Sequence, residues 1–205
     1  MPLAHALPAR ALQFPRDHGS HPELRTEWWY ITGYATAGGR PFGFQVTFFR
    51  SRMDATQAMQ SAFAAKQLVF AHAAVTDVQG RRLLHDQRMA RAGFGVAQAS
   101  EADTAVRLRD WSLQRQDTAR GKPDTATSRY TTLVVGEHFG LQLQFDATQP
   151  LLLQGQQGLS RKGPQAAQAS YYYSQPQLAV SGRIVLDGRT LPIDTTQPAR
   201  AWMDH

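Results

Sequence analysis

The segment Thr26-Glu27-Trp28-Trp29-Tyr30 places one carboxyl group among three large aromatic side chains. On an extended strand alternate residues face opposite sides, so Glu27 and Trp29 share one face while Trp28 and Tyr30 share the other. Rings of this kind commonly fill a protein core. They can instead line a cavity, where burial would raise the pKa of Glu27 and let it donate a proton. The segment therefore predicts either core packing or an acid in an apolar cavity.

A second aromatic cluster consists of Tyr171, Tyr172 and Tyr173. Ordinary strand packing with the hydroxyls at the rim is one explanation, and the wall of a site for a long apolar ligand is the other. We expect Trp28 or Trp29 to face one cavity together with at least one of these tyrosines, because both clusters are too aromatic for exposed strand surface. The nearby glycines match neither a phosphate-binding nor a dinucleotide-binding loop, so nucleotide binding is not indicated.

Two histidines are candidates for proton transfer. His72 shares a strand face with Leu68 and Phe70, which predicts either a hydrogen-bonded core histidine or an acid–base group facing a cavity. His205 is the last residue and follows Asp204, and such a pair can orient and charge an imidazole. A terminal residue is ordinarily frayed, which is the alternative for His205.

A group of histidines and acidic residues near the start of the chain is a weak candidate for a metal site. His18 and His21 lie close to Asp17, Glu23 and Glu27, but they lack the helical spacing of a zinc protease. Loop residues of these types more often form turns and hydrogen bonds. We therefore expect no metal and no organic cofactor. A serine-hydrolase nucleophile motif is also absent from the sequence.

The amino-acid composition excludes several kinds of chemistry and binding partner. The chain has 205 residues, of which 42% are hydrophobic and 19% charged, as in a folded globular protein. It contains no cysteine, which excludes disulfides and thiolate chemistry. The formal net charge is +6, but the basic residues form no stripe, so nucleic acid is not an expected partner. Neither a signal peptide nor an apolar run of about 18 residues is visible, so the sequence leaves the localisation open.

Alternation and turn signals recur along the chain and predict an all-β protein. A short helix over 54–65 and an exposed loop over 118–128 interrupt the pattern. Hairpins join most neighbouring strands, as in an up-and-down antiparallel barrel, with a β sandwich as the alternative. We expect one domain over 1–205, with its core at about 14–195. The predicted strands span residues 27–34, 42–50, 67–76, 83–90, 105–113, 130–135, 141–146, 177–186 and 190–193.

Several ordered motifs between residues 14 and 205 resemble the carotenoid 1,2-hydratase and AttH-like family of lipocalin-like proteins, to which kievitone hydratase is related. The resemblance is specific for the family and not for one activity. The motifs are Phe14-Pro15-Arg16-Asp17-His18-Gly19-Ser20-His21-Pro22-Glu23, Thr26-Glu27-Trp28-Trp29-Tyr30-Ile31-Thr32-Gly33, Gly43-Phe44-Gln45-Val46-Thr47-Phe48-Phe49-Arg50, Phe70-Ala71-His72-Ala73-Ala74, Ser160-Arg161-Lys162-Gly163-Pro164, Ala169-Ser170-Tyr171-Tyr172-Tyr173-Ser174 and Ala201-Trp202-Met203-Asp204-His205.

The resemblance implies a lipocalin-like barrel and a bulky apolar ligand of isoprenoid or lipid type. Members usually have two such barrels, so the chain would be the amino-terminal half, with a second lipocalin-like domain as its partner. The family's hydratases use the histidine and tryptophan of an Asp-His-Glu-Trp motif, with an aspartate and a tyrosine farther on. Only Asp204 and His205 carry over to this chain, so hydratase activity of the chain alone is not expected.

The chemistry that the family implies is acid-catalysed addition of water to a C=C bond. A carboxylic acid protonates the bond, aromatic faces stabilise the resulting cation, and water attacks it. The alternative is a non-enzymatic AttH-like binding protein that works with an ABC transporter. A periplasmic or membrane-associated location, with peripheral contact to the membrane or the transporter, is also implied.

Overall fold

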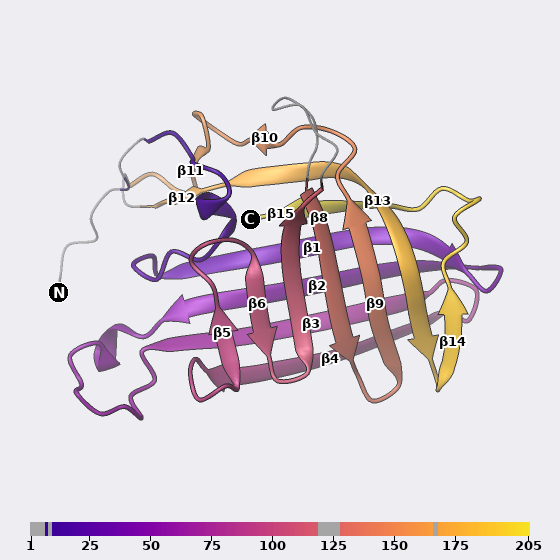
Figure 1. Cartoon of the computed structure of the whole chain (residues 1–205), viewed down its shortest axis with the longest axis horizontal. Helices are drawn as coiled ribbons and strands as arrows, with labels where there is room; N and C mark the ends of the chain where they lie inside the picture. The colour runs from indigo at the N-terminus through magenta and orange to yellow at the C-terminus, as the bar shows by residue number, and fades with distance from the viewer. Residues whose placement is uncertain (1–6, 8–9, 119–127, 166–167) are drawn as a thin grey trace.

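The computed structural model describes residues 7, 10–118, 128–165 and 168–205. They form an antiparallel sheet of 13 strands that curls into a nearly closed lipocalin-like barrel, with a separate two-stranded sheet beside it (Figure 1). The strands are β1 (Thr26–Ala37), β2 (Arg40–Arg52), β3 (Gln67–Asp77), β4 (Arg82–Arg91), β5 (Ala97–Ala99), β6 (Ala105–Leu108), β7 (Trp111–Asp117), β8 (Ser128–Val135), β9 (Phe139–Asp146), β10 (Leu152–Leu153), β11 (Leu159–Arg161), β12 (Ala169–Tyr171), β13 (Tyr173–Leu186), β14 (Arg189–Pro192) and β15 (Arg200–Asp204).

The order of the main strands is β4-β3-β2-β1-β15-β13-β9-β8-β7-β6-β5. Most neighbours are joined by hairpins, as predicted, but β1 and β15 connect the two ends of the chain in the middle of the sheet. Strands β4 and β5 are the two edges of the sheet, so hydrogen bonds do not close the barrel completely in the part of the chain that the structure describes. The predicted antiparallel barrel is thus confirmed, with an opening between these two edges.

The core lies inside the barrel and follows the predicted alternation. Phe42, Phe44, Val46 and Phe48 of β2 are buried, as are Glu27, Trp29 and Ile31 of β1. All of these except Glu27 form one hydrophobic cluster with buried side chains from β3, β7, β8, β9 and β13. Side chains therefore fill the centre of the barrel.

Helical structure is limited to short turns in the described residues. They are the 3-10 turns η1 (Arg16–His18) and η2 (Asp54–Thr56), so the helix expected over 54–65 shrinks to three residues. No helix among the described residues is long and apolar enough to cross a membrane.

Two strand predictions also change. The strand expected over 105–113 is two strands, β6 and β7, which separate at Arg109, where φ is 57° and the chain turns. The last strand, β15, was not predicted, because its five residues carry no turn signal or clear alternation that marks them as a strand. Most of the loop expected over 118–128 lies outside the described residues.

Candidate functional site

The candidate site lies at the end of the barrel where the segment that contains η1 and the C-terminus meet (Figure 1). A cavity of about 20 Å³ opens there, which is room for about one water molecule. The residues that line it come from this segment, β1, β12, β13 and the C-terminus: Leu12, Asp17, His21, Leu24, Thr26, Glu27, Trp28, Ser170, Tyr171, Tyr173 and His205.

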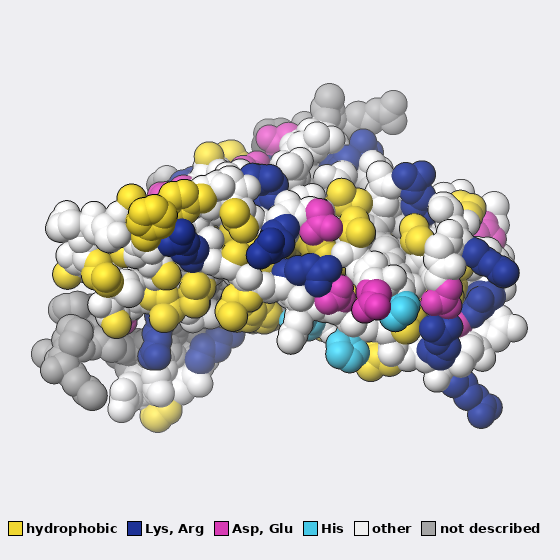
Figure 2. All heavy atoms as spheres, turned by 90° about the horizontal axis from the view of Figure 1, so that it is seen from below, with side chains coloured by type: hydrophobic (Ala, Val, Ile, Leu, Met, Phe, Trp, Pro, Cys, Tyr) yellow, Lys and Arg dark blue, Asp and Glu magenta, His cyan; other side chains and the backbone are white. Residues whose placement is uncertain are grey.

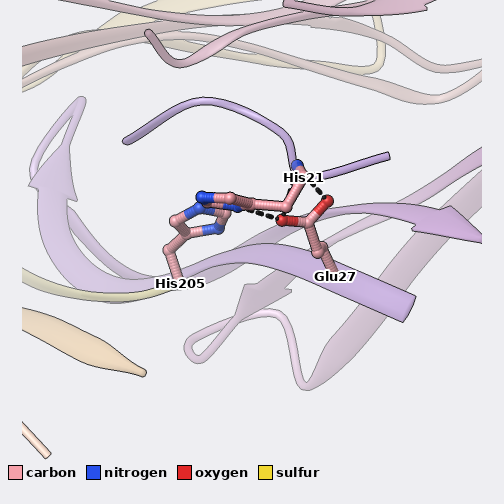
Figure 3. Close-up of side chains that lie close together, drawn as sticks. All are labelled: His21, Glu27 and His205. Carbon is pink, nitrogen blue, oxygen red and sulfur yellow. Dashed lines mark hydrogen bonds and ion pairs between the residues drawn. The ribbon is translucent and has the colours of Figure 1, made fainter. Parts of the chain in front are cut away.

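His21 is the centre of a buried polar network in this cavity. Its Nδ1 lies 2.6 Å from Oε1 of Glu27, and its Nε2 lies 2.7 Å from Oδ1 of Asp17. The His21 backbone N–H also donates to both carboxylate oxygens of Glu27, at 2.9 and 2.8 Å. Figure 3 shows the His21 ring turned toward Glu27, with His205 beside it. The loop around His21 is therefore fixed to β1 through a single carboxylate.

Two arginines complete the network. Arg50 of β2 donates to Oε2 of Glu27 from Nε at 2.8 Å and from an Nη at 2.6 Å. Arg10 donates to both oxygens of Asp17, each at 2.7 Å. The resulting chain runs Arg10–Asp17–His21–Glu27–Arg50, so its charges alternate when His21 is protonated. Alternation of this kind lets buried charges compensate one another.

The network sets the protonation of its members. Burial alone would lower the pKa of His21, but the hydrogen bonds to Glu27 and Asp17 outweigh it and raise that pKa. Burial alone would raise the pKa of Glu27, but the hydrogen bond from His21 and the charge of Arg50 outweigh it and lower that pKa. The expected rise in the pKa of Glu27 is therefore wrong. Glu27 is an ionised carboxylate that holds its neighbours and has no proton to donate.

Asp17 is ionised for the same reason. Burial opposes its ionisation, but hydrogen bonds from Arg10, the Gln13 backbone and His21 bring its pKa well below the usual range. Both carboxyl groups that line the cavity are thus carboxylates at neutral pH.

The side chains of His21, Glu27 and His205 also satisfy the spacing of a metal site, since one ligand atom from each lies within 4.8 Å of the others. Their hydrogen bonds argue for another role. Both ring nitrogens of His21 face carboxylates, and Arg50 already gives Glu27 a positive partner. A metal ion would have to break these bonds and bind beside a guanidinium, so the donors fit a hydrogen-bonded network better than a metal site.

His205 occupies an aromatic cage at the cavity. It is only 8% exposed, so this terminal residue is ordered in the barrel rather than frayed. Its ring stacks on Trp29 with centroids 4.7 Å apart, and the Tyr173 ring approaches edge-on at 5.4 Å. The backbones of His205 and Tyr173 exchange two hydrogen bonds, of 2.8 and 3.1 Å. The cage therefore fixes both the position and the tilt of the imidazole.

The surroundings of His205 favour a neutral ring. Burial lowers its pKa, although the negative charge of Glu27 and the Trp28 carbonyl act in the opposite direction. Nδ1 lies 2.8 Å from the Trp28 carbonyl oxygen, so Nδ1 carries the proton and donates it there. Nε2 lies 3.3 Å from the Gly19 carbonyl oxygen, a longer contact to which a neutral ring with its proton on Nδ1 cannot donate.

Asp204 does not orient His205. Its carboxylate accepts hydrogen bonds from Ser174 Oγ at 2.6 Å and from Trp202 Nε1 at 2.7 Å. Adjacent strand residues point to opposite faces, so Asp204 lies toward the outer face of β15 while His205 turns inward. The expected Asp204–His205 pair is thus replaced by contacts of His205 with backbone carbonyls.

The structure brings part of the predicted aromatic set together. Trp28, Tyr171 and Tyr173 line this cavity together, and a ligand-binding role for them remains a prediction. Tyr172 lies on the outer side, where its ring meets Trp28 edge-on at 6.1 Å and Lys162 lies over it at 4.1 Å.

The remaining predicted residues do not line the cavity. Trp29 is fully buried behind His205. Tyr30 and His72 lie on the outer face of β1 and β3, and His72 stacks near Phe49 with centroids 6.1 Å apart. His72 is therefore neither a core histidine nor part of this site.

His18 is a functional candidate that we considered only as part of a weak metal site. It is 1% exposed, and its Nδ1 lies 2.7 Å from the Tyr173 hydroxyl. Its carbonyl oxygen accepts the Trp29 indole N–H at 3.1 Å and the Thr104 hydroxyl at 2.8 Å. A single residue thus anchors the two rings that enclose His205. Only the fold shows this, because Tyr173 is 155 positions away in sequence.

Arg50 was also not singled out, although the sequence contained the signal. It continues the core-facing alternation of Phe42, Phe44, Val46 and Phe48, so a strand interpretation buries it. A buried arginine needs a carboxylate, and the register of the predicted hairpin pairs Arg50 directly with Glu27.

Comparisons with known proteins agree with this fold. A family model described as AttH-like matches residues 5–205. The crystal structure of an AttH homologue from Nitrosomonas europaea is 43% identical, with a TM-score of 0.80, and the match covers 98% of this chain and 57% of that one. Kievitone hydratase from Nectria haematococca is 11% identical, with a TM-score of 0.61 over 87% of this chain and 46% of that one, which shows a shared fold only.

The chain spans about half the length of these two proteins. A search of curated proteins returned no match. The family model covers nearly all of the sequence, and a relative of known structure shares 43% of its residues. The chain therefore belongs to the AttH-like family.

Proposed function

We propose that this chain binds an apolar alkene at the aromatic rim of the cavity and holds His205 there as the general base of a hydratase-like site. The observation that carries the proposal is the placement of His205, a buried imidazole caged by Trp29 and Tyr173 at a cavity that Trp28 and Tyr171 also line. Ligand sites commonly combine such apolar walls with a few convergent polar groups.

The cavity is too small for the alkene, so the alkene must bind outside it. Its volume of about 20 Å³ admits a water molecule and excludes a bulky apolar ligand. Trp28 is half-buried, on the face of β1 that turns away from the core. The register places Phe49 of β2 and Phe70 of β3 next to it on the same face. The alkene would therefore lie across these rings, with one end at the cavity.

The cavity and His205 are placed to bind the attacking water molecule rather than the alkene. A neutral imidazole protonated at Nδ1 leaves Nε2 without a proton, so Nε2 can take one from a water molecule that attacks a carbocation. Protonation of the alkene needs an acid, and Asp17 and Glu27 are both ionised. In this account the chain supplies the base and the aromatic surface, and the acid comes from a group outside it. This agrees with the expectation that the chain alone does not catalyse the hydration.

The test is a fluorescence titration with an acyclic carotenoid, followed by a search for its hydration product. Tryptophan emission should be quenched to saturation, because Trp28 lies at the rim and Trp29 directly behind His205. The carotenoid should be recovered unchanged from the chain alone. Unaltered emission at saturating carotenoid would reject the binding site, and efficient hydration would reject the assignment of the acid.

One observation favours a second candidate, a binding protein without chemistry. The carboxylates of the cavity are fully engaged by Arg10, His21 and Arg50 and have structural roles. An AttH-like carrier that works with an ABC transporter would need only the apolar rim. Neighbouring permease and ATPase genes would support this candidate, whereas genes of carotenoid synthesis would support the hydratase.

A further inference from the structure

Two loops at the edge of the barrel expose large apolar side chains. Phe63 and Phe94 are 69% and 58% exposed, and their rings stack with centroids 5.4 Å apart and planes 8° from parallel. Met59, in the same loop as Phe63, is 48% exposed, and Met89 near the end of β4 is 67% exposed. We call these four side chains the edge patch. Exposed apolar groups gathered in this way commonly mark an interaction surface.

The charges around the edge patch are positive. The segments 55–66 and 89–99, which carry the four side chains, contain no aspartate or glutamate. The Arg91 guanidinium lies over both rings, 5.3 Å from Phe63 and 4.6 Å from Phe94. Arg107 donates to the Gly95 carbonyl, and Lys66 ends the first loop.

Figure 2, seen from below, shows hydrophobic side chains grouped toward one end of this face with basic side chains among them; basic side chains also continue along the face, while most of the visible acidic ones lie nearer its centre and other end. Aromatic side chains with basic neighbours match the chemistry of an anionic lipid surface, where rings enter the interface and cations meet the headgroups.

The edge patch is also connected to the candidate site. The strand register sets Trp28, Phe49, Phe70 and Met89 side by side across β1, β2, β3 and β4, on the face turned away from the core. The Phe49 and Phe70 rings stack at 4.5 Å. This row starts at the cavity, which Trp28 lines, and ends at Met89 of the edge patch.

We propose that the edge patch docks this chain on an anionic lipid bilayer, and that the row from Met89 to Trp28 leads an apolar ligand from the bilayer to the cavity. The docking goes beyond the proposed function and does not depend on it. Only the route of the ligand rests on that function. Docking is therefore tested with lipid alone.

The first experiment places a polarity-sensitive dye at position 63. The sequence has no cysteine, so Phe63→Cys creates a single labelling position. Its matched control is Leu133→Cys on the outer face of β8, where Leu133 is 41% exposed. On vesicles of phosphatidylcholine and phosphatidylglycerol, the emission of the dye at position 63 should shift to the blue, and that at position 133 should not. No shift at position 63, or an equal shift at both, would overturn the proposal.

The second experiment removes the side chains. In co-sedimentation with the same vesicles, Phe63→Ser/Phe94→Ser should weaken binding roughly tenfold or more. The control Leu133→Ser/Val135→Ser removes two exposed apolar side chains of β8 that are not members of the edge patch and should change binding by less than about twofold. Circular dichroism verifies that both variants are folded. Added salt should weaken the binding of the unaltered chain.

The same experiment separates lipid from protein partners. If the chain ignores the vesicles but self-associates with rising concentration, and Phe63→Ser/Phe94→Ser abolishes this, the edge patch is a contact between copies and the lipid proposal is overturned. Failure of the fluorescence titration with carotenoid would leave the vesicle result unaffected. The two proposals can therefore fail independently.

Discussion

The imidazole of His21 lies between two carboxylates, with Nε2 2.7 Å from Asp17 Oδ1 and Nδ1 2.6 Å from Glu27 Oε1. Both nitrogens can donate only if the ring is protonated, so the geometry and the raised pKa agree. The Arg50 guanidinium also donates to the carbonyl oxygens of His21 and Leu24. One ionic network thus attaches the loop that covers the cavity to the first two strands.

Removing the negative charge of Glu27 should lower the stability of the folded protein. Glu27→Gln leaves Arg50 buried without a full counter-charge, and we expect the free energy of unfolding in urea to fall by about 3 kcal/mol. The control is Asp187→Asn, which breaks the exposed Arg82–Asp187 pair and should cost less than about 1 kcal/mol. Equal losses in the two variants would show that the buried network contributes no special stability.

His21 should make stability depend on pH above its unfolded pKa. Its folded pKa is raised, so its contribution is fully present below about pH 6.5 and is lost as the pH rises through the folded pKa. His21→Gln should remove this decline. Urea unfolding of both proteins between about pH 6 and 9 should give curves whose separation shrinks as the pH rises, by at most about 1.4 kcal/mol per unit. Parallel curves would contradict the protonated ring.

His18 should have the opposite effect. Burial, together with the charge of Arg115, lowers its pKa to about 2, so the unfolded chain binds a proton below pH 6.5 that the folded chain does not. The free energy of unfolding should therefore decrease as the pH is lowered below about 6.5. His18→Asn keeps an acceptor for the Tyr173 hydroxyl and should reduce this slope by up to about 1.4 kcal/mol per pH unit. An unchanged acid slope would show that His18 is protonated in the folded protein.

Ligand binding should depend on Trp28 more than on another tryptophan that does not line the cavity. Trp28→Leu removes an aromatic wall and should weaken binding of an acyclic carotenoid about tenfold in the fluorescence titration. Trp202→Leu is the matched control. Trp202 is 37% exposed, and its indole N–H donates to Asp204. If both variants bind alike, the ligand does not use the rim of the cavity.

The sequence predicted the parts of the fold that depend on local pattern. The alternation in 27–34 and 42–50 identified the core faces of β1 and β2, and the turn between them fixed their register. The helix over 54–65 failed because good helix formers do not suffice in a segment with no apolar stripe to pack. Strand β15 depends on pairing with β1 and β13, which lie far away in sequence.

The candidate site was only partly predictable. Its aromatic members were visible as unusual clusters, and the register of the first hairpin could have joined Glu27 to Arg50. The lowered pKa of Glu27 depends most on the hydrogen bond from His21, and that contact forms only when the loop around His21 folds over β1. The cage around His205 requires β13, β15 and the His18 loop to meet, which is a property of the whole barrel.

Nitrogen-15 NMR of the seven histidines tests the central claim, that an apolar ligand lies next to a neutral His205. Without ligand, the His205 ring should show the signals of the neutral form with the proton on Nδ1. Titration with an acyclic isoprenoid should move these signals to saturation, while those of His138, whose side chain is 62% exposed, stay unchanged. A charged His205, or a ring whose signals ignore saturating ligand, would contradict the account.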